Sequence, residues 1–182
     1  MRSLNWKAWS VAVVSAALAV YASGLLYEGF VASGYAGDAT YPFVDKAAAE
    51  RAWNGLGVDA PAAARRKAAL RLVRADPASP RSWTALAYAD RTARHALTPA
   101  GVAALEQSYQ VSFFDLRDAT WRVDFALENW PALTPPLRQQ VLTEAQVALA
   151  DPRLAPAMKA RLRSIRDPAG HLAAALLLAG AR

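Results

Sequence analysis

The 182-residue sequence contains no cysteine and only two histidines. The lack of cysteine excludes disulfide bonds, thiolate metal ligands and a cysteine nucleophile. His95 and His171 lie far apart in the sequence, and neither has a carboxylate partner in helical register, so a histidine metal site would need a tertiary coincidence. Glycine-rich phosphate loops, the G-x-S-x-G turn and the H-E-x-x-H motif are also missing. We therefore predict a protein that is not an enzyme, without catalytic residues, metal ligands or a cofactor.

Charge is absent from one long stretch near the N-terminus. Residues 8–27 are twenty consecutive uncharged residues. In a helix that rises about 1.5 Å per residue, they span the roughly 30 Å hydrocarbon core of a bilayer. Trp6 and Trp9 at one end and Tyr27 at the other are typical of side chains that anchor a helix at the membrane interface. We predict an N-terminal signal anchor over residues 1–30, a transmembrane helix whose residues 8–27 contact membrane lipid.

The distribution of positive charge predicts how this segment is oriented. Arg2 and Lys7 precede it, and no lysine or arginine follows until Lys46. The positive-inside rule then places the N-terminus in the cytoplasm and the rest of the chain across the membrane. Two alternatives remain, namely a signal peptide cleaved near Ala22 and a soluble buried helix. Residues 31–43 show no helical period and combine glycine with small polar residues, which indicates a linker.

β-Branched residues are scarce after the first 45 positions, whereas alanine is abundant and eleven prolines punctuate the chain. This composition favours helices separated by proline-marked turns. Five prolines directly follow a residue suited to N-capping: Ser79, Thr98, Thr134, Asp151 and Asp167. We predict an all-α domain over residues 44–182, a short stack of antiparallel helical hairpins. The expected helices span residues 44–54, 60–75, 80–95, 99–111, 115–130, 135–150, 152–166 and 168–180.

The expected helix 115–130 is apolar on two sides, because Trp121 and Phe125 form a second strip beside its main stripe. A helix of this kind packs against neighbours on both sides, so we expect it to be central. Asp118 and Arg122 have the i,i+4 spacing of ordinary surface ion pairs, and we expect them to form one.

Two of the later expected helices, 135–150 and 168–180, differ in character. The helix 135–150 has an apolar face that includes Leu137 and Val141, and Glu144 is expected on its solvent face. Residues 168–181 are fourteen uncharged residues, too few for an unassisted membrane span. We expect them to pack as the last helix of the stack. The alternative is an exposed apolar end that binds a partner.

The stretch "RADPASPRSWTALAYAD" links two of the expected helices. Pro77 closes one helix, and the next brings Trp83 followed by Leu86 and Ala87. This pattern resembles the junction between two tetratricopeptide repeats, where a proline ends one repeat and an aromatic residue opens the next helix. The resemblance covers residues 65–90. It implies that the Trp83 side chain packs between hairpins and does not stack on a ligand.

The next unit departs from that family. Trp121 follows Trp83 by 38 residues instead of about 34, and Asp124 and Phe125 stand where leucine and a small residue would be. The segment 112–145 is similar to one in small membrane-anchored repeat-like proteins of bacterial surface-polysaccharide assembly loci, and the resemblance covers about residues 100–150. The resemblance implies a non-enzymatic scaffold in the bacterial inner membrane. Its body would lie in the periplasm and dock envelope membrane proteins for polysaccharide synthesis or export.

A basic stripe offers an alternative function. The chain has 21 lysines and arginines against 15 acidic residues, a net charge of +6. Lys67, Arg71 and Arg74 recur at i, i+4 and i+7, with Arg65 and Arg66 just before them. Guanidinium groups pair bidentately with phosphate and carboxylate, so this stripe would contact an anionic lipid or an acidic glycan. The other interpretation is a solvated helix face, and the predicted location disfavours nucleic acid.

An acidic cluster raises one further possibility. Asp115, Asp118, Asp124 and Glu128 fall in a single expected helix, and paired carboxylates are the catalytic groups of glycoside hydrolases. However, Arg117 and Arg122 are interleaved with them, which is typical of surface ion pairs. Glycan hydrolysis is therefore the least favoured of the three functional hypotheses.

Overall fold

The computed structural model describes residues 42–57 and 59–180, so the predicted anchor with Trp6, Trp9 and Tyr27, and most of the predicted linker, lie outside the described residues. All regular structure in the described residues is helical, which confirms the predicted all-α class. None of their helices combines the length and the apolar character that crossing a bilayer requires. The chain divides into two compact units, residues 1–55 and 56–182. The first contains α2 (Pro42–Asn54).

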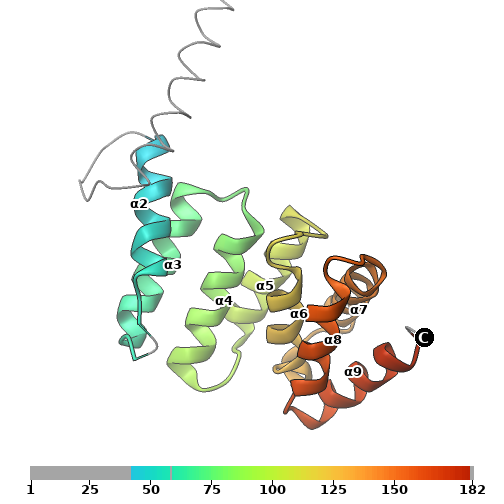
Figure 1. Ribbon diagram of the computed structural model, residues 1–182. Coiled ribbons are helices and arrows are strands. Elements are labelled where there is room, and N and C mark those ends of the chain that lie inside the picture. The colour runs from blue at the N-terminus through green and yellow to red at the C-terminus, as the bar shows by residue number, and fades with distance from the viewer. Residues whose placement is uncertain (1–41, 58, 181–182) are drawn as a thin grey trace, which may run out of the picture. The chain divides into compact units, whose positions relative to one another are not determined.

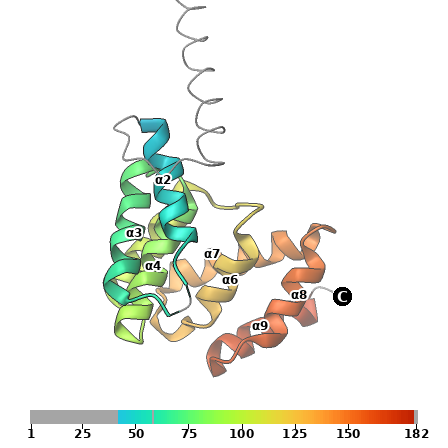
Figure 2. The same cartoon turned by 60° about the vertical axis from the view of Figure 1, so that its left-hand side comes forward.

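The second unit is a succession of helices, most of which pack against the next helix along the chain (Figures 1 and 2). α3 packs on α4 and α4 on α5, while α6 contacts α7, α8 and α9. α6 thus packs against several neighbours, as its two apolar sides predict, but α7, α8 and α9 each contact at least as many elements, so these contacts do not single α6 out as central. The bounds are α3 (Ala62–Ala75), α4 (Pro80–Arg94), α5 (Pro99–Val111), α6 (Ala119–Leu127), a 3-10 turn η1 (Trp130–Ala132), α7 (Pro135–Ala150), α8 (Ala155–Ser164) and α9 (Pro168–Gly180).

Several predicted N-caps determine where these helices begin. The side-chain oxygens of Thr98, Thr134 and Asp167 accept a hydrogen bond from the backbone N–H three residues later, at 3.5, 3.4 and 2.8 Å. Such bonds satisfy N–H groups that have no partner in the first turn. Ser79 makes no such bond, although α4 begins after it as predicted. Asp151 closes a separate turn, so α8 begins three residues later than predicted.

The core of the second unit forms around α6. Trp83 is partly buried against this core and donates its indole N–H to the Pro77 carbonyl at 2.8 Å, which confirms that it is a packing residue. The largest apolar side chains that are fully buried come from α5 to α8: Leu105, Val123, Leu127, Leu137, Val141, Met158 and Leu162.

The predicted helix 115–130 is shorter than expected. Asp115 accepts the backbone N–H of Arg117 at 2.8 Å through its carboxylate, so residues 115–118 form a turn ahead of α6. At the other end the Asn129 amide donates to the Phe125 carbonyl at 2.7 Å. A side chain that bonds the last carbonyls in this way competes with continuation of the helix.

Two charged side chains that were expected on the surface are fully buried, so the predicted Asp118–Arg122 surface pair is wrong. Arg122 and Glu144 are each 0% exposed. Arg122 Nε donates to one Glu144 oxygen at 3.0 Å, and a second guanidinium nitrogen pairs with the other oxygen. The Tyr109 hydroxyl donates to Glu144 at 2.7 Å, and the Arg122 guanidinium lies 4.1 Å from the centre of the Tyr109 ring.

The same guanidinium also holds the end of α5. Arg122 donates to the carbonyls of Ser108, Ser112 and Phe113 at 3.2, 3.0 and 3.0 Å. These carbonyls lie at the C-terminus of α5, where the helix dipole favours a cation. Burial raises the pKa of Glu144, against the opposing effect of Arg122, and burial raises the pKa of Tyr109 well above 10. The network therefore joins α5, α6 and α7.

Candidate functional site

The predicted basic stripe is divided by the structure. Arg65 is only 7% exposed, donates to the Gly57 carbonyl at 2.9 Å and lies over the Tyr88 ring at 5.8 Å. Arg65 is therefore a packing residue of the helical unit and does not belong to the surface predicted for ligand contact. The remaining four cations are exposed on α3 and are called the α3 basic face: Arg66, Lys67, Arg71 and Arg74.

The predicted acidic cluster is occupied by structural interactions. The two carboxylate oxygens of Glu128 accept backbone N–H groups just before α9, at 2.8 and 3.3 Å. Asp124 pairs with Arg161 at 3.5 Å, and burial raises the pKa of Asp124 against the opposing charge of that arginine. Burial also raises the pKa of Asp118, which lies at the N-terminal end of α6.

The two histidines lie in separate environments. His171 Nδ1 is 3.2 Å from the Ile165 carbonyl. His95 ends α4 with a φ of 57°, a left-handed conformation that is unusual for a residue with a Cβ. Across residues 42–57 and 59–180, no three histidine, aspartate or glutamate side chains gather as a metal site would require.

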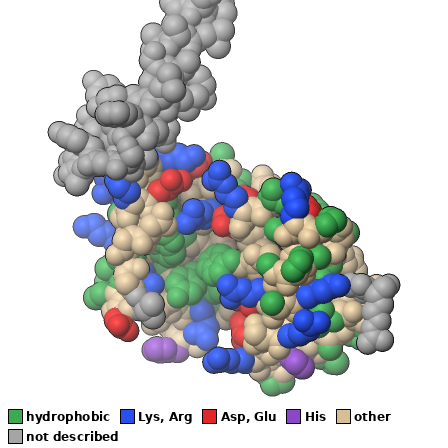
Figure 3. Space-filling model, in the orientation of Figure 1, with side chains coloured by type: hydrophobic (Ala, Val, Ile, Leu, Met, Phe, Trp, Pro, Cys, Tyr) green, Lys and Arg blue, Asp and Glu red, His purple; other side chains and the backbone are tan. Residues whose placement is uncertain are grey.

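The α4, α6 and α8 region forms a groove of about 630 Å³. Three aromatic side chains make its floor: Tyr88, Trp121 and Phe125. The Trp121 and Phe125 rings stack with centroids 5.7 Å apart and planes at 15°, and Tyr88 lies tilted against both, at 5.8 and 6.1 Å. In Figure 3 the molecule is hollowed here, and green side chains are surrounded by blue and red ones. We call this site the aromatic groove.

The rim of the aromatic groove carries more positive than negative charge. Arg91, Arg161 and Arg166 stand there against Asp124 and Glu128, whose carboxylate already accepts the N–H groups before α9. Arg91 Nε donates a 3.0 Å hydrogen bond to Oδ1 of the Asn129 side chain, which fixes the position of the guanidinium group. Aromatic faces pack on flat apolar groups, while guanidinium groups pair with carboxylates. The groove therefore combines contacts for apolar and anionic groups.

Sequence reasoning missed this groove because it assigned Trp121 and Phe125 to packing alone. A usable signal was present on each helix. Tyr88, Arg91 and His95 recur at i, i+3 and i+7 on α4, which places them on one face. What the spacing does not reveal is that this face lies opposite the Trp121 and Phe125 strip of α6.

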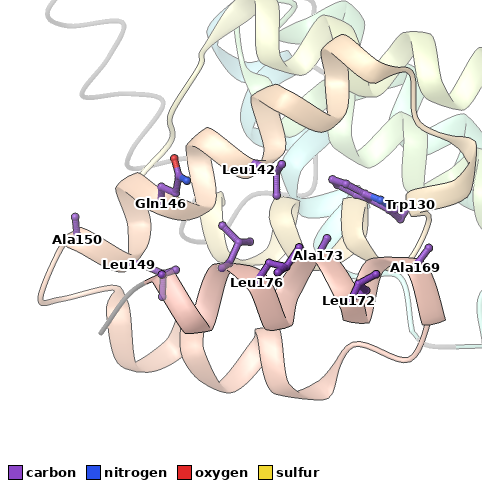
Figure 4. A pocket seen from close by; sticks show the side chains of 11 residues that line it. Trp130, Leu142, Gln146, Leu149, Ala150, Ala169, Leu172, Ala173 and Leu176 are labelled. Atoms are coloured by element: carbon purple, nitrogen blue, oxygen red, sulfur yellow. The ribbon is translucent and has the colours of Figure 1, made fainter.

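A second groove, of about 730 Å³, lies between α7 and α9 (Figure 4). Leu142 and Leu149 of α7 face Ala173 and Leu176 of α9, and Trp130 stands at one end. Gln146 and the Trp130 indole supply the polar side-chain atoms of its lining. We call this site the apolar groove.

No protein-family model matches the sequence, and no match was found among curated proteins or among solved structures.

Proposed function

We propose that the chain is a non-enzymatic, membrane-anchored scaffold that docks a component of a bacterial envelope complex for surface-polysaccharide synthesis or export. In this proposal residues 1–30 span the inner membrane with the N-terminus in the cytoplasm. The helical body is a short tetratricopeptide-like stack in the periplasm. The uncharged run at 8–27 and the position of the positive charges support the anchor and its orientation. The sequence resemblance supports the envelope role.

The observation that carries the docking role is the aromatic groove. Its floor of three packed rings offers a rigid apolar surface, and ordered aromatic side chains contribute large contact area at low entropic cost. Its rim has three arginines against two carboxylates, and Arg161 already pairs with Asp124, so one net positive charge remains. Charge complementarity therefore favours an acidic partner segment that also carries an aromatic or aliphatic anchor.

Site-specific photo-crosslinking of the full chain in its native membranes tests this role. A photoreactive residue at Thr92 or His95, both in the groove lining, should trap an envelope membrane protein. The same residue at Gln139, which is exposed on α7 and lines neither groove, should not.

Charge reversal on the rim sharpens the test. Arg161→Glu combined with Arg166→Glu should reduce the adduct at least tenfold, because both side chains line the groove. Arg163→Glu, an exposed change on α8 outside the groove, should leave the adduct unchanged. Adducts with cytosolic proteins alone, or an adduct indifferent to the rim reversals, would refute docking at the aromatic groove.

The α3 basic face favours a second candidate function, the binding of an acidic glycan or an anionic lipid. Four cations are exposed on one side of α3, while the opposite side is buried through Ala68, Ala69 and Leu72. Exposed charges of this kind bind polyanions in a salt-sensitive manner.

The test compares binding of a polyuronate and of short-chain phosphatidylglycerol to the detergent-solubilised full chain at low and high salt. Lys67→Glu, Arg71→Glu and Arg74→Glu together should abolish the salt-sensitive binding. Reversal of Arg153 and Arg163, exposed elsewhere, should preserve it. Binding that survives the triple reversal would leave only the scaffold function.

A further inference from the structure

α9 has an unusual surface for the outer helix of a stack. Its thirteen residues contain no aspartate, glutamate, lysine or arginine, whereas each of the other described α-helices carries at least one. Leu172 and Leu176, which share a face at i and i+4, are 63% and 68% exposed. Large apolar side chains that lie together on an exposed helix face commonly mark an interaction site. The surface of α9 is that of a helix with another layer on top of it.

The two exposed leucines form the outer wall of the apolar groove. Both line the cavity, together with the small residues Ala169 and Ala173 on the same helix (Figure 4). The lining runs along α9 from Ala169 to Gly180, roughly 17 Å of helix at about 1.5 Å per residue. Small side chains let a second helix approach closely. The leucines form a ridge beside the groove, which is the surface shape that a second helix with its own ridge and groove can pack against.

The chemistry of the groove limits what can fill it. Charged groups would be desolvated against Leu142 and Leu149 without a partner, so the occupant must present an uncharged apolar face. An anionic membrane surface is a poor match, because helices that lie on such membranes carry lysine or arginine beside their apolar face and α9 carries neither. The groove fits an uncharged helix with projecting aliphatic side chains.

α9 itself is a helix of that description. We propose that the apolar groove is occupied by a second copy of this chain, with α9 of each protomer packed against α9 of the other about a twofold axis. Leu172 and Leu176 of each protomer then enter the apolar groove of the other protomer. This reciprocal contact is the self-complementarity that an isologous interface requires. The chain has a net charge of +6, and the uncharged α9 lets two copies meet without opposing like charges.

The absence of cysteine makes the contact directly testable, because a single introduced cysteine is the only thiol in the chain. Leu172→Cys and Leu176→Cys are each introduced into the full chain and oxidised in native membranes. A disulfide forms only when the two Cα atoms come within about 7 Å, so it reports close apposition about the axis. At least one of the two variants should give a disulfide-linked dimer, and Lys67→Cys on α3 should stay monomeric. Failure of both leucine positions to cross-link would overturn the proposed packing.

A second measurement uses the unmodified full chain in mild detergent, by analytical ultracentrifugation across a concentration series. We expect the wild-type chain to form a dimer. In the Leu172→Glu/Leu176→Glu variant the dissociation constant of this dimer should rise at least tenfold. Leu116→Glu is the matched control, since Leu116 is 46% exposed but lies outside the groove. Circular dichroism confirms that each variant keeps its helical content. A monomer at every concentration, or a dimer weakened equally by Leu116→Glu, would overturn the proposal.

Discussion

Removing Arg122 is the change that should most disturb this fold. The side chain is 0% exposed and makes two contacts with Glu144, which is equally buried. At the 3.0 Å separation of Nε and the carboxylate oxygen, Coulomb's law with an effective dielectric of about 20 gives an attraction of roughly 5 kcal/mol. Arg122→Met keeps an unbranched side chain of similar length, but leaves Glu144 buried with only the Tyr109 hydroxyl as a side-chain donor.

We expect this variant to lose about 3–5 kcal/mol of unfolding free energy, the usual result when one partner of a buried pair is removed. With a urea dependence of about 2 kcal/mol per molar, the unfolding midpoint should fall by roughly 2 M. Urea titration of the full chain in mild detergent, followed by circular dichroism, measures it. The loss should shrink as the pH is lowered toward 4, because protonation removes the uncompensated charge of Glu144.

Two further variants make this prediction falsifiable. Arg163→Met changes an exposed arginine of α8, and should leave the midpoint unchanged. Arg122→Met combined with Glu144→Leu should recover most of the lost stability, since no charge is then left buried. A loss below about 1 kcal/mol for Arg122→Met, typical of surface pairs, would refute this account of the core.

The remaining predictions concern other sites. In the wild type the buried Tyr109 phenol keeps its proton, while the unfolded chain releases it near pH 10, so the folded state loses stability as the pH rises above 10. Tyr109→Phe should therefore lose less stability than the wild type between pH 8 and pH 11, as measured by urea titration at both values. Gly170→Ala should cost about 1–3 kcal/mol in the same assay, because a Cβ there would lie 1.9 Å from the Leu127 carbonyl oxygen; an unchanged midpoint would contradict this close approach. Nuclear magnetic resonance titration should find a pKa of about 2 for Asp151, where bonds from Arg153 favour the ionised form, and Arg153→Met should move it up toward 3.8.

Much of the fold could be predicted because its signals are local. Proline at the first helical position and a capping oxygen before it identify helix starts within a few residues, as at Thr98 and Thr134. The main failures came from interactions between distant residues. Glu144 and Arg122 each look solvent-facing on their own helices, and only the pairing across 22 positions makes their burial favourable. A helical wheel does not contain that information.

The grooves were predictable only in part. An exposed apolar C-terminal end was among the alternatives for residues 168–181, and the exposure of Leu172 and Leu176 favours it, although the same helix also packs on its neighbours. The aromatic groove depends on Tyr88 from α4 meeting Trp121 from α6, a tertiary arrangement. The interfacial roles of residues in the first thirty positions stay predictions.

The stretch from Arg166 to Gly170 belongs to both grooves. Arg166 is on the rim of one and Ala169 lines the other, while Glu128 holds the backbone between α8 and α9 and Gly170 rests on the end of α6. A substitution in these five residues therefore alters both grooves at once. A genetic screen that measures only the loss of one partner will assign such a substitution to one groove, although the other groove is altered as well. Substitutions that each affect a single groove, at Arg161 in the aromatic groove and at Leu176 in the apolar groove, keep the two phenotypes separable.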